Sequence, residues 1–174
     1  MNFQTCCPAE QMQDFLRTMQ RAPFAAAEIA GSAEHPAIGG RVSFYETTCG
    51  VLVSALICGL PAADCACGRR IFAMHIHSGA ACTGNAEDPF ADTLSHYNPG
   101  GCAHPAHAGD LPPLFENGGH AFSVFLTDRF SVREVLGKTV VIHAGPDDFK
   151  TQPSGDAGRK IACGKIEKCG ARRC

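Results

Sequence analysis

Two histidines separated by one residue are the first place along the chain where metal chemistry is possible. His75 and His77 lie in the segment 70–77, whose composition predicts a β-strand. Alternate residues of a strand point to the same face, with Cβ atoms about 7 Å apart, so the two imidazoles could bind one ion. The pair alone is more typical of a polar strand face that binds nothing.

A second group is richer in ligands and has no strand or helix periodicity. His96, His104, His107 and Asp110 are separated by glycine, proline and alanine, which let a loop turn its side chains inward. Three imidazoles and one carboxylate form a ligand set that tetrahedral zinc accepts. The alternative is a surface loop with incidental histidines.

A third position is His143, which ends the predicted strand 138–143, with Asp147 close behind it in an irregular stretch, 144–158. A single histidine at a strand end is more often structural than a ligand. The chain has eight histidines in all, and most of them fall into these three groups, each beside a strand end or an irregular loop. This grouping favours a shared metal centre.

The elements that must position these groups are predicted to be short strands. Nineteen glycines and eleven prolines indicate many turns. The predicted strands are 24–32, 41–48, 51–60, 70–77, 119–126, 138–143 and about 160–167. We expect the strand 51–60 to be covered on both sides. The pattern predicts an all-β, antiparallel Greek-key β-sandwich or flattened barrel of the immunoglobulin-like type.

Two further segments depart from this strand pattern. Residues 8–20 predict a short helix whose apolar face should pack against the domain; this face consists of Met12, Phe15, Leu16 and Met19. Residues 78–113 form a long segment without periodicity, and such a loop in a compact domain needs something to hold it. Because it contains three histidines, we expect bound metal to order it.

Length and charge bound the remaining possibilities. A chain of 174 residues is one domain of ordinary size, and a net charge of −2 gives no reason to expect nucleic acid or a membrane as partner. No apolar run approaches the ~18 residues that span a bilayer. The first residues lack the basic start and apolar core of a secretory signal, so we expect a cytoplasmic location.

The cysteine count, eleven, is high and odd. A secreted disulfide scaffold is usually shorter and has an even number. Ordinary reduced thiols are favoured over a thiolate metal site, because neither Cys6-Cys7 nor Cys65-Ala-Cys67 has CxxC spacing. No role is predicted from the sequence for these four residues, or for Cys169 and Cys174 near the C-terminus.

Four segments, in chain order, resemble the signature segments of the copper–zinc superoxide dismutases: AMHIHSGAAC, HYNPGGCAHPAHAGDLP, VVIHAGPDD and SGDAGRKIACGKI. The resemblance is nearest to a cytoplasmic bacterial branch with shortened loops. It implies a dismutase domain over 24–167, between an N-terminal extension, 1–23, and a cysteine-containing tail, 168–174. It also implies an oxidoreductase that converts two superoxide anions to dioxygen and hydrogen peroxide, with one copper and one zinc per subunit, and it allows a homodimer.

The resemblance also implies a role for each site residue. Copper would be bound by His75, His77, His96 and His143. Zinc would be bound by His96, His104, His107 and Asp110, so that His96 bridges the two metals as an imidazolate and supplies a proton to the nascent peroxide. Asp147 would link ligands of the two metals, since ligating imidazoles require an acceptor for their second N–H.

The remaining matches concern a disulfide and a cationic side chain. Cys82 and Cys163 match the disulfide of the family, with two free thiols as the alternative in a reducing compartment. Lys160 stands where the family has an arginine, which keeps the charge but loses the planar fork. We expect Lys160, with Arg159 and Lys150 near the rim, to attract superoxide.

Two other functions are compatible with the same residues. The first is a protein that stores or senses copper or zinc on this fold with little turnover. The second is a structural module that binds zinc only, in which His75, His77 and His143 hold no metal. Metal content measured together with superoxide consumption separates these functions from the enzyme.

Overall fold

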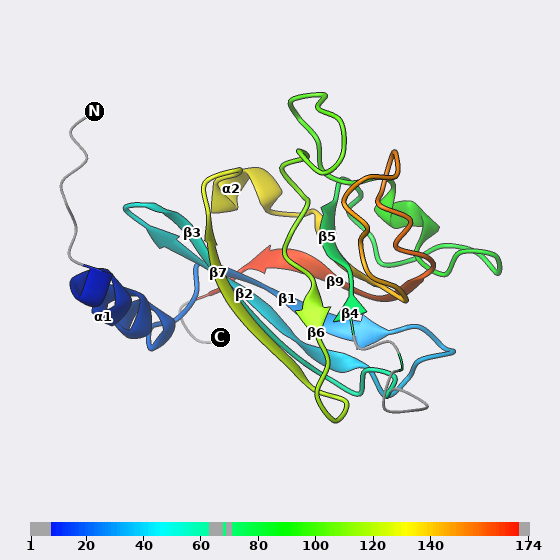
Figure 1. Ribbon diagram of the computed structural model, residues 1–174, viewed down its shortest axis with the longest axis horizontal. Helices are drawn as coiled ribbons and strands as arrows, with labels where there is room; N and C mark the ends of the chain where they lie inside the picture. Colours follow the sequence, from blue (N-terminus) through cyan, green and yellow to red (C-terminus); the bar gives the residue numbers. More distant parts are fainter. Residues whose placement is uncertain (1–7, 63–67, 69–70, 171–174) are drawn as a thin grey trace.

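The computed structural model describes residues 8–62, 68 and 71–170. Its strands are β1 (Ala25–Gly31), β2 (Gly39–Thr47), β3 (Gly50–Cys58), β4 (Ile71–Phe72), β5 (Met74–His77), β6 (Leu114–Phe115), β7 (Ala121–Thr127), β8 (Thr139–His143) and β9 (Lys160–Lys168). Its helices are α1 (Pro8–Met19), a 3₁₀ turn η1 (Ala91–Thr93) and α2 (Val132–Val135). One seven-stranded sheet has the order β5-β8-β9-β1-β2-β3-β7, and β4 pairs with β6 (Figure 1). All the pairings are antiparallel, and the predicted fold class is confirmed.

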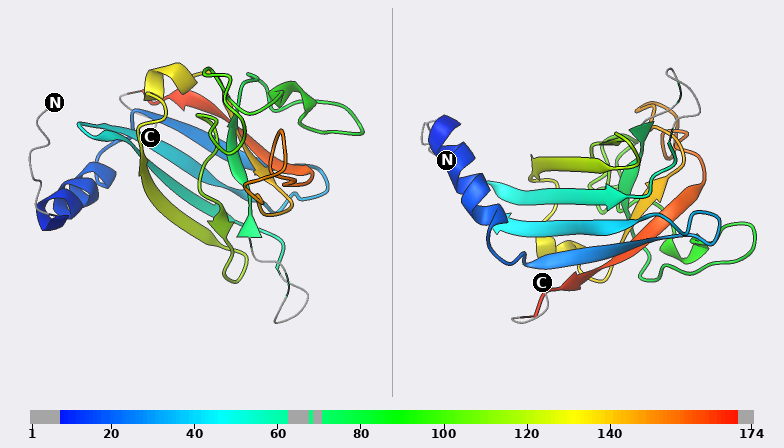
Figure 2. Two further views of the ribbon diagram at one scale, coloured as in Figure 1. Left: turned by 45° about the horizontal axis from the view of Figure 1, so that its top comes forward. Right: turned by 90° about the horizontal axis from the view of Figure 1, so that it is seen from below.

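The sheet curls around a core made by one face of each strand (Figure 2). Phe44 of β2 lies opposite Val53 of β3 in the antiparallel register, and both side chains are fully buried. Burial of a side chain of this kind contributes about 1.5–3 kcal/mol. The sheet is therefore held by apolar packing that does not involve the histidines.

The strand β5 shows how the core and the histidines are separated. Met74 and Ile76 alternate with His75 and His77, and all four side chains are buried. Since alternate residues face opposite sides, the apolar pair packs in the core while the histidines lie on the outer face. The irregular segments 78–113 and 144–159 lie over that outer face (Figure 1).

The predicted strand 70–77 is two strands in the structure. The chain changes partners at Ala73: β4 pairs with β6, whereas β5 pairs with β8. The partner β6 and the short helices η1 and α2 were not predicted, because two to four residues are too few to show a periodicity.

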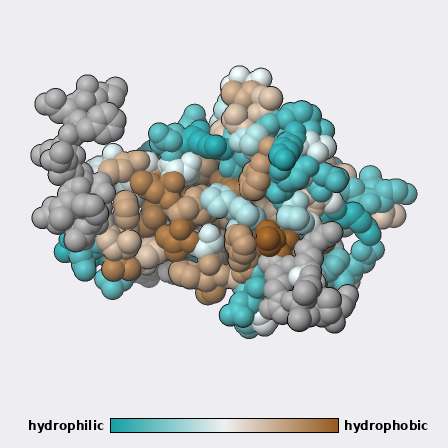
Figure 3. All heavy atoms as spheres, viewed as in Figure 1, coloured by the Kyte–Doolittle hydropathy of each residue, from teal (hydrophilic) through white to brown (hydrophobic). Residues whose placement is uncertain are grey.

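Two expectations about packing are wrong. Met12 and Leu16 of α1 are 58% and 44% exposed, so the apolar face of this helix does not pack fully against the domain. Leu56 of β3 is also exposed, although Leu52 on the same strand is covered. With Phe122 on β7, Leu56 belongs to an apolar surface visible over β7 in Figure 3.

Among the helices in the described part of the chain, none has the length and apolar character needed to cross a bilayer.

Candidate metal centre

The residues singled out in the sequence come together on the outer face of β5 and β8. They form two groups of potential ligands whose donor atoms lie within 4.8 Å of one another in each group. The first group is His75, His77, His96 and His143, and the second is His96, His104, His107 and Asp110. His96 is the one residue common to both, and every member is buried.

Backbone pairing brings the loop histidines to the strand histidines. His77 pairs with His96, and His75 pairs with Asp110, each in an isolated antiparallel bridge. On the other side of β5, the antiparallel register with β8 places His143 at the end of that strand, on the same face as the β5 histidines. Two points of the loop 78–113, at His96 and at Asp110, are thus held beside β5.

Hydrogen bonds outside the centre determine which nitrogen of each ring faces inward. His77 Nδ1 lies 2.9 Å from the Leu94 carbonyl oxygen, and His143 Nδ1 lies 3.1 Å from that of Gly158. Each of these ring nitrogens can donate to its carbonyl, which leaves the two Nε2 atoms free. Those Nε2 atoms lie 3.3 Å apart and face each other.

Asp147 orients one histidine of each group. Its Oδ2 atom lies 2.8 Å from His75 Nε2, and its Oδ1 atom lies 2.9 Å from His104 Nε2. A Cβ atom at Gly155 would lie 2.0 Å from Asp147 Oδ1, so a glycine is needed for this carboxylate to reach both rings. With Nε2 engaged, each of these two histidines turns Nδ1 toward its own group.

The second group is arranged around the carboxylate of Asp110. Its oxygens lie 2.8 Å from His96 Nδ1, 3.0 Å from His104 Nδ1 and 3.3 Å from His107 Nδ1. The backbone N–H of His107 donates to the same carboxylate at 3.0 Å. His96 therefore presents Nδ1 to this group and Nε2 to the other.

The donor atoms fit the two metals expected from the sequence. His75 Nδ1, His96 Nε2 and His104 Nδ1 are buried and make no hydrogen bond in the described part of the chain, since the Asp110 oxygen 3.0 Å from His104 Nδ1 lacks hydrogen-bond geometry. A buried polar atom without a partner is costly, and a metal ion would satisfy all three. Four nitrogens suit copper, whereas three nitrogens with one carboxylate suit zinc.

Burial keeps three histidines of the first group, His75, His77 and His143, neutral. It lowers the pKa of His75 to about 2, and the nearby His96 and His143 contribute further. It also lowers the pKa of His143 to about 4, although the hydrogen bond to Gly158 acts in the opposite direction. The pKa of His77 is lowered for the same reason. A neutral imidazole is the form that binds a metal.

The carboxylate of the second group stays ionised. Burial raises the pKa of Asp110, but hydrogen bonds from His96 and from the backbone of His107 outweigh this and lower it to about 2. The first group thus contributes three neutral rings, and the second contributes one fixed negative charge.

Arg129 is a contributor that the sequence did not reveal. Its Nη1 atom lies 3.2 Å from the carbonyl oxygens of Pro105 and His107, and 3.3 Å from that of Asp110. This guanidinium therefore holds three carbonyls of the ligand-bearing loop. No local motif marks it, because the contact joins the end of β7 to a loop about twenty residues earlier.

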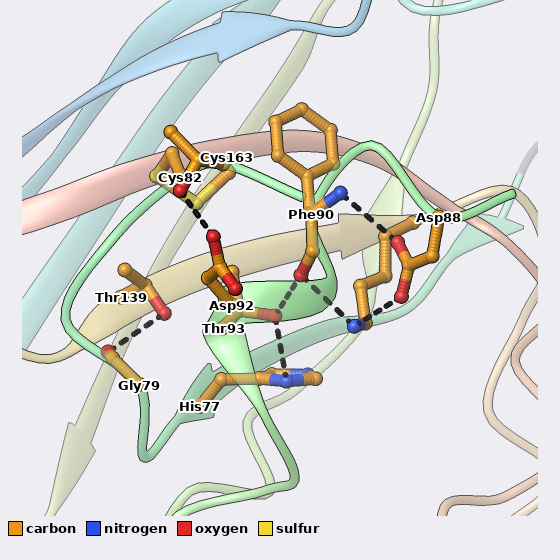
Figure 4. Close-up of a disulfide and its surroundings, with 11 residues drawn as sticks. His77, Gly79, Cys82, Asp88, Phe90, Asp92, Thr93, Thr139 and Cys163 are labelled. Carbon is orange, nitrogen blue, oxygen red and sulfur yellow. Dashed lines mark hydrogen bonds and ion pairs between the residues drawn. A yellow bond between two sulfur atoms is a disulfide. The ribbon is translucent and has the colours of Figure 1, made fainter. Parts of the chain in front are cut away.

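A cleft of about 740 Å³ leads to the centre and is lined in part by His77, His96 and His143. Lys160 also lines it, and its ammonium group donates to Asp88 Oδ2 at 2.7 Å and to the Phe90 carbonyl oxygen at 3.0 Å. These acceptors belong to the loop shown in Figure 4. Lys160 thus lies at the cleft with its charge paired, which the sequence did not predict.

The other two cations expected near the rim differ from each other. Arg159 lines the cleft and pairs with Glu34 at 3.2 Å, both side chains being largely exposed. Lys150 is exposed and is not among the described residues that line the cleft.

The predicted disulfide between Cys82 and Cys163 is confirmed (Figure 4). It joins the loop 82–93 to β9 across 81 positions of sequence, and the Cys163 side chain packs with Phe90 and Val141. On the chain-entropy account, a loop of this length contributes about 4.5 kcal/mol. From the sequence, most of the other cysteines are expected to be free thiols.

Among the described residues, Cys49, Cys58 and Cys102 are free and exposed, whereas Cys169 is disulfide-bonded. Cys6, Cys7, Cys65, Cys67 and Cys174 lie outside the described residues.

Comparison with known proteins agrees with this arrangement. Residues 38–166 match the family model of copper/zinc superoxide dismutase. A Cu-Zn superoxide dismutase of Aquifex aeolicus is 34% identical over 142 residues, covering 73% of this chain and 78% of the relative. That of Legionella pneumophila is also 34% identical, over 149 residues, covering 81% of this chain and 85% of the relative.

Among solved structures, the Cu/Zn superoxide dismutase from Brucella abortus superposes with a TM-score of 0.68. The superposition covers 82% of this chain and 99% of the other at 22% identity, and it supports the fold. The family match spans both groups of ligands and most of the sheet that carries them. The chain therefore belongs to the copper/zinc superoxide dismutase family.

Proposed function

We propose that this chain disproportionates superoxide through two adjoining metal sites that share His96. In this proposal His75, His77, His96 and His143 hold copper, and His96, His104, His107 and Asp110 hold zinc. The observation that carries it is the geometry of His96, whose two ring nitrogens belong to two different groups of donors. A site for one metal needs only one nitrogen of a histidine ring, whereas His96 offers one nitrogen to each of two groups.

Each residue has a distinct task in the reaction. Copper, when bound, would supply the one-electron redox chemistry, and zinc would be held by the second group, of which His96 is also a member. His77 and His143 orient their Nε2 atoms through hydrogen bonds to backbone carbonyls. Asp147 fixes His75 and His104 together, so that the two groups keep their spacing.

His96 can supply one of the two protons that the reaction consumes, and water supplies the other. Two superoxide anions and two protons give one dioxygen and one hydrogen peroxide. His96 Nε2 is buried, has no hydrogen-bond partner among the described residues and belongs to the first group, so it is the atom that can take up a proton and pass it to the peroxide. Lys160 lies in the wall of the cleft and attracts the anionic substrate.

Metal analysis of the purified protein, together with superoxide consumption before and after copper addition, tests this proposal. The expected result is one copper and one zinc per chain, with activity that requires copper. Full occupancy of both metals without turnover would instead indicate a storage or sensing protein. Zinc occupancy without copper binding would indicate a zinc module.

The homodimer and the cytoplasmic location expected from the sequence stay predictions. Sedimentation of the metal-loaded protein at micromolar concentration and fractionation of cells that produce the chain test them separately.

A further inference from the structure

The charged side chains of the cleft cancel one another. Apart from the histidines, the charged residues that line it are Glu87, Asp88, Arg159 and Lys160, two acids and two bases. A cleft lined by one sign of charge raises the rate at which an oppositely charged substrate arrives. These four groups have no net charge, so they raise the rate of superoxide arrival less than two cations alone would.

Asp88 is the acid of the cleft that contacts Lys160. Its Oδ2 atom accepts a hydrogen bond of 2.7 Å from Lys160. The side chain of Lys160 is 15% exposed, whereas that of Asp88 is 38% exposed. The carboxylate is therefore the more exposed member of the pair, and both groups line the cleft.

The carboxylate is held firmly in this position. Asp88 Oδ1 accepts from the backbone N–H of Phe90 at 3.0 Å, and the backbone N–H of Asp88 donates to the Asn85 side chain at 2.9 Å. The Phe90 carbonyl oxygen in turn accepts from Lys160. Figure 4 shows Asp88 and Phe90 on the loop that the Cys82–Cys163 disulfide ties to β9. Asp88 cannot swing away from Lys160 without loss of these contacts.

We propose that Asp88 is a positioning residue that anchors Lys160 to the cleft wall and offsets its charge, and so limits the rate of superoxide capture. This inference rests on the proposed function and adds a control on substrate arrival. Removal of the negative charge should then make the enzyme faster. Asp88→Asn removes this charge and keeps one acceptor oxygen for Lys160, while its amide nitrogen replaces the oxygen that accepts from the backbone N–H of Phe90.

Asp92→Asn is the matched control. Asp92 lies in the same loop and loses the same charge, but it accepts from Thr83 at 2.5 Å and is not among the residues that line the cleft. Both variants are compared with the native protein as copper- and zinc-loaded, disulfide-bonded protein. The measurements are the bimolecular rate with superoxide as a function of ionic strength, and the affinity of the copper site for azide, an anion of equal charge.

For Asp88→Asn we expect a rate about two- to fourfold higher at low salt, the effect of one unit charge acting through water over about 5–10 Å. The gain should vanish as salt screens it, and azide should bind more tightly by a similar factor. Asp92→Asn should match the native protein at low salt within about 1.5-fold. The double variant Asp88→Asn with Lys160→Gln should recover the native salt dependence.

A rate and salt dependence of Asp88→Asn equal to native, or a slower variant, would overturn the inference. So would an equal gain in Asp92→Asn, because the effect would then follow overall charge. If the loaded native protein shows no turnover, the proposed function fails; the azide affinities still report on Asp88 independently.

Discussion

The two groups of ligands are supported in different ways. Three of the four proposed copper ligands, His75, His77 and His143, stand on strands whose opposite face packs in the core. The three residues that only the zinc group contains lie in the irregular segment 78–113. Strand ligands keep their positions because the sheet does, whereas loop ligands depend on local polar contacts and on the metal itself. Loss of metal should therefore affect the two regions unequally.

The largest expected effect separates the two groups at His143. His143→Ala should lower dismutase activity by more than about 100-fold, because one of four copper ligands is lost, and leave zinc binding intact. Metal analysis and a superoxide assay on the same sample check this. His120→Ala, which removes an exposed histidine outside both groups, is the control. Near-native turnover of His143→Ala would show that the copper ligands are assigned wrongly.

Hydrogen exchange should reveal the difference between strand and loop directly. We expect the amides of 96–110 to gain protection on zinc binding, because the carboxylate of Asp110 and its three histidine neighbours lack their central ion without it. The amides of β2 and β3 should change little. Equal protection of the loop in metal-free and zinc-loaded protein would mean that its hydrogen bonds are sufficient to order it.

A smaller effect is expected from Arg129, which holds the loop that carries the zinc ligands. Arg129→Ala should weaken zinc binding about tenfold, since three carbonyls of the ligand loop lose their donor. Competition with a chelator measures this without reference to activity, and Arg129→Lys should restore part of the affinity. Arg133→Ala is the control, because Arg133 is exposed and pairs with Glu46 rather than with the loop. An unchanged zinc affinity in Arg129→Ala would exclude this role.

The pH dependence of metal-free protein should also differ between the groups. An unfolded histidine has a pKa of about 6.5, whereas that of His143 is about 4 in the folded chain. Protons therefore favour the unfolded chain, and stability should fall as the pH drops from about 6.5 toward 4, by about 3 kcal/mol for His143 alone. Ionised Asp110 stabilises the folded chain above about pH 4, and this contribution is lost as the pH falls from about 4 toward 2.

Urea unfolding of the metal-free protein at pH 7 and pH 5 measures how much the free energy of unfolding falls between these pH values. This fall should be smaller in His143→Ala, because the variant lacks one of the responsible groups. An equal fall in the native protein and in His143→Ala would show that other groups cause the pH dependence.

The sequence predicted most of the sheet but less of what surrounds it. β8 carries a run of β-branched residues and ends at His143, and β3 is rich in apolar residues, so both strands could be predicted from local pattern. The break at Ala73 and the role of Arg129 could not, because each depends on pairing between distant segments. The exposure of Met12 and Leu16 shows that an apolar helix face does not by itself specify its neighbour.

The sequence predicted a cation near the copper ligands at Lys160, but it did not predict that Asp88 pairs with this cation. The sequence places a cation beside the ACG segment, but only the folded loop brings Asp88 to it, 72 positions away. Electrostatic arguments from one side chain are incomplete for this reason.

A crystal structure of the copper- and zinc-loaded protein, with anomalous scattering recorded at both metal edges, tests the central claim most directly. The account predicts copper among His75, His77, His96 and His143, zinc among His96, His104, His107 and Asp110, and the His96 ring between them. Two metals with no histidine in common, or a single metal that fills both groups, would contradict it.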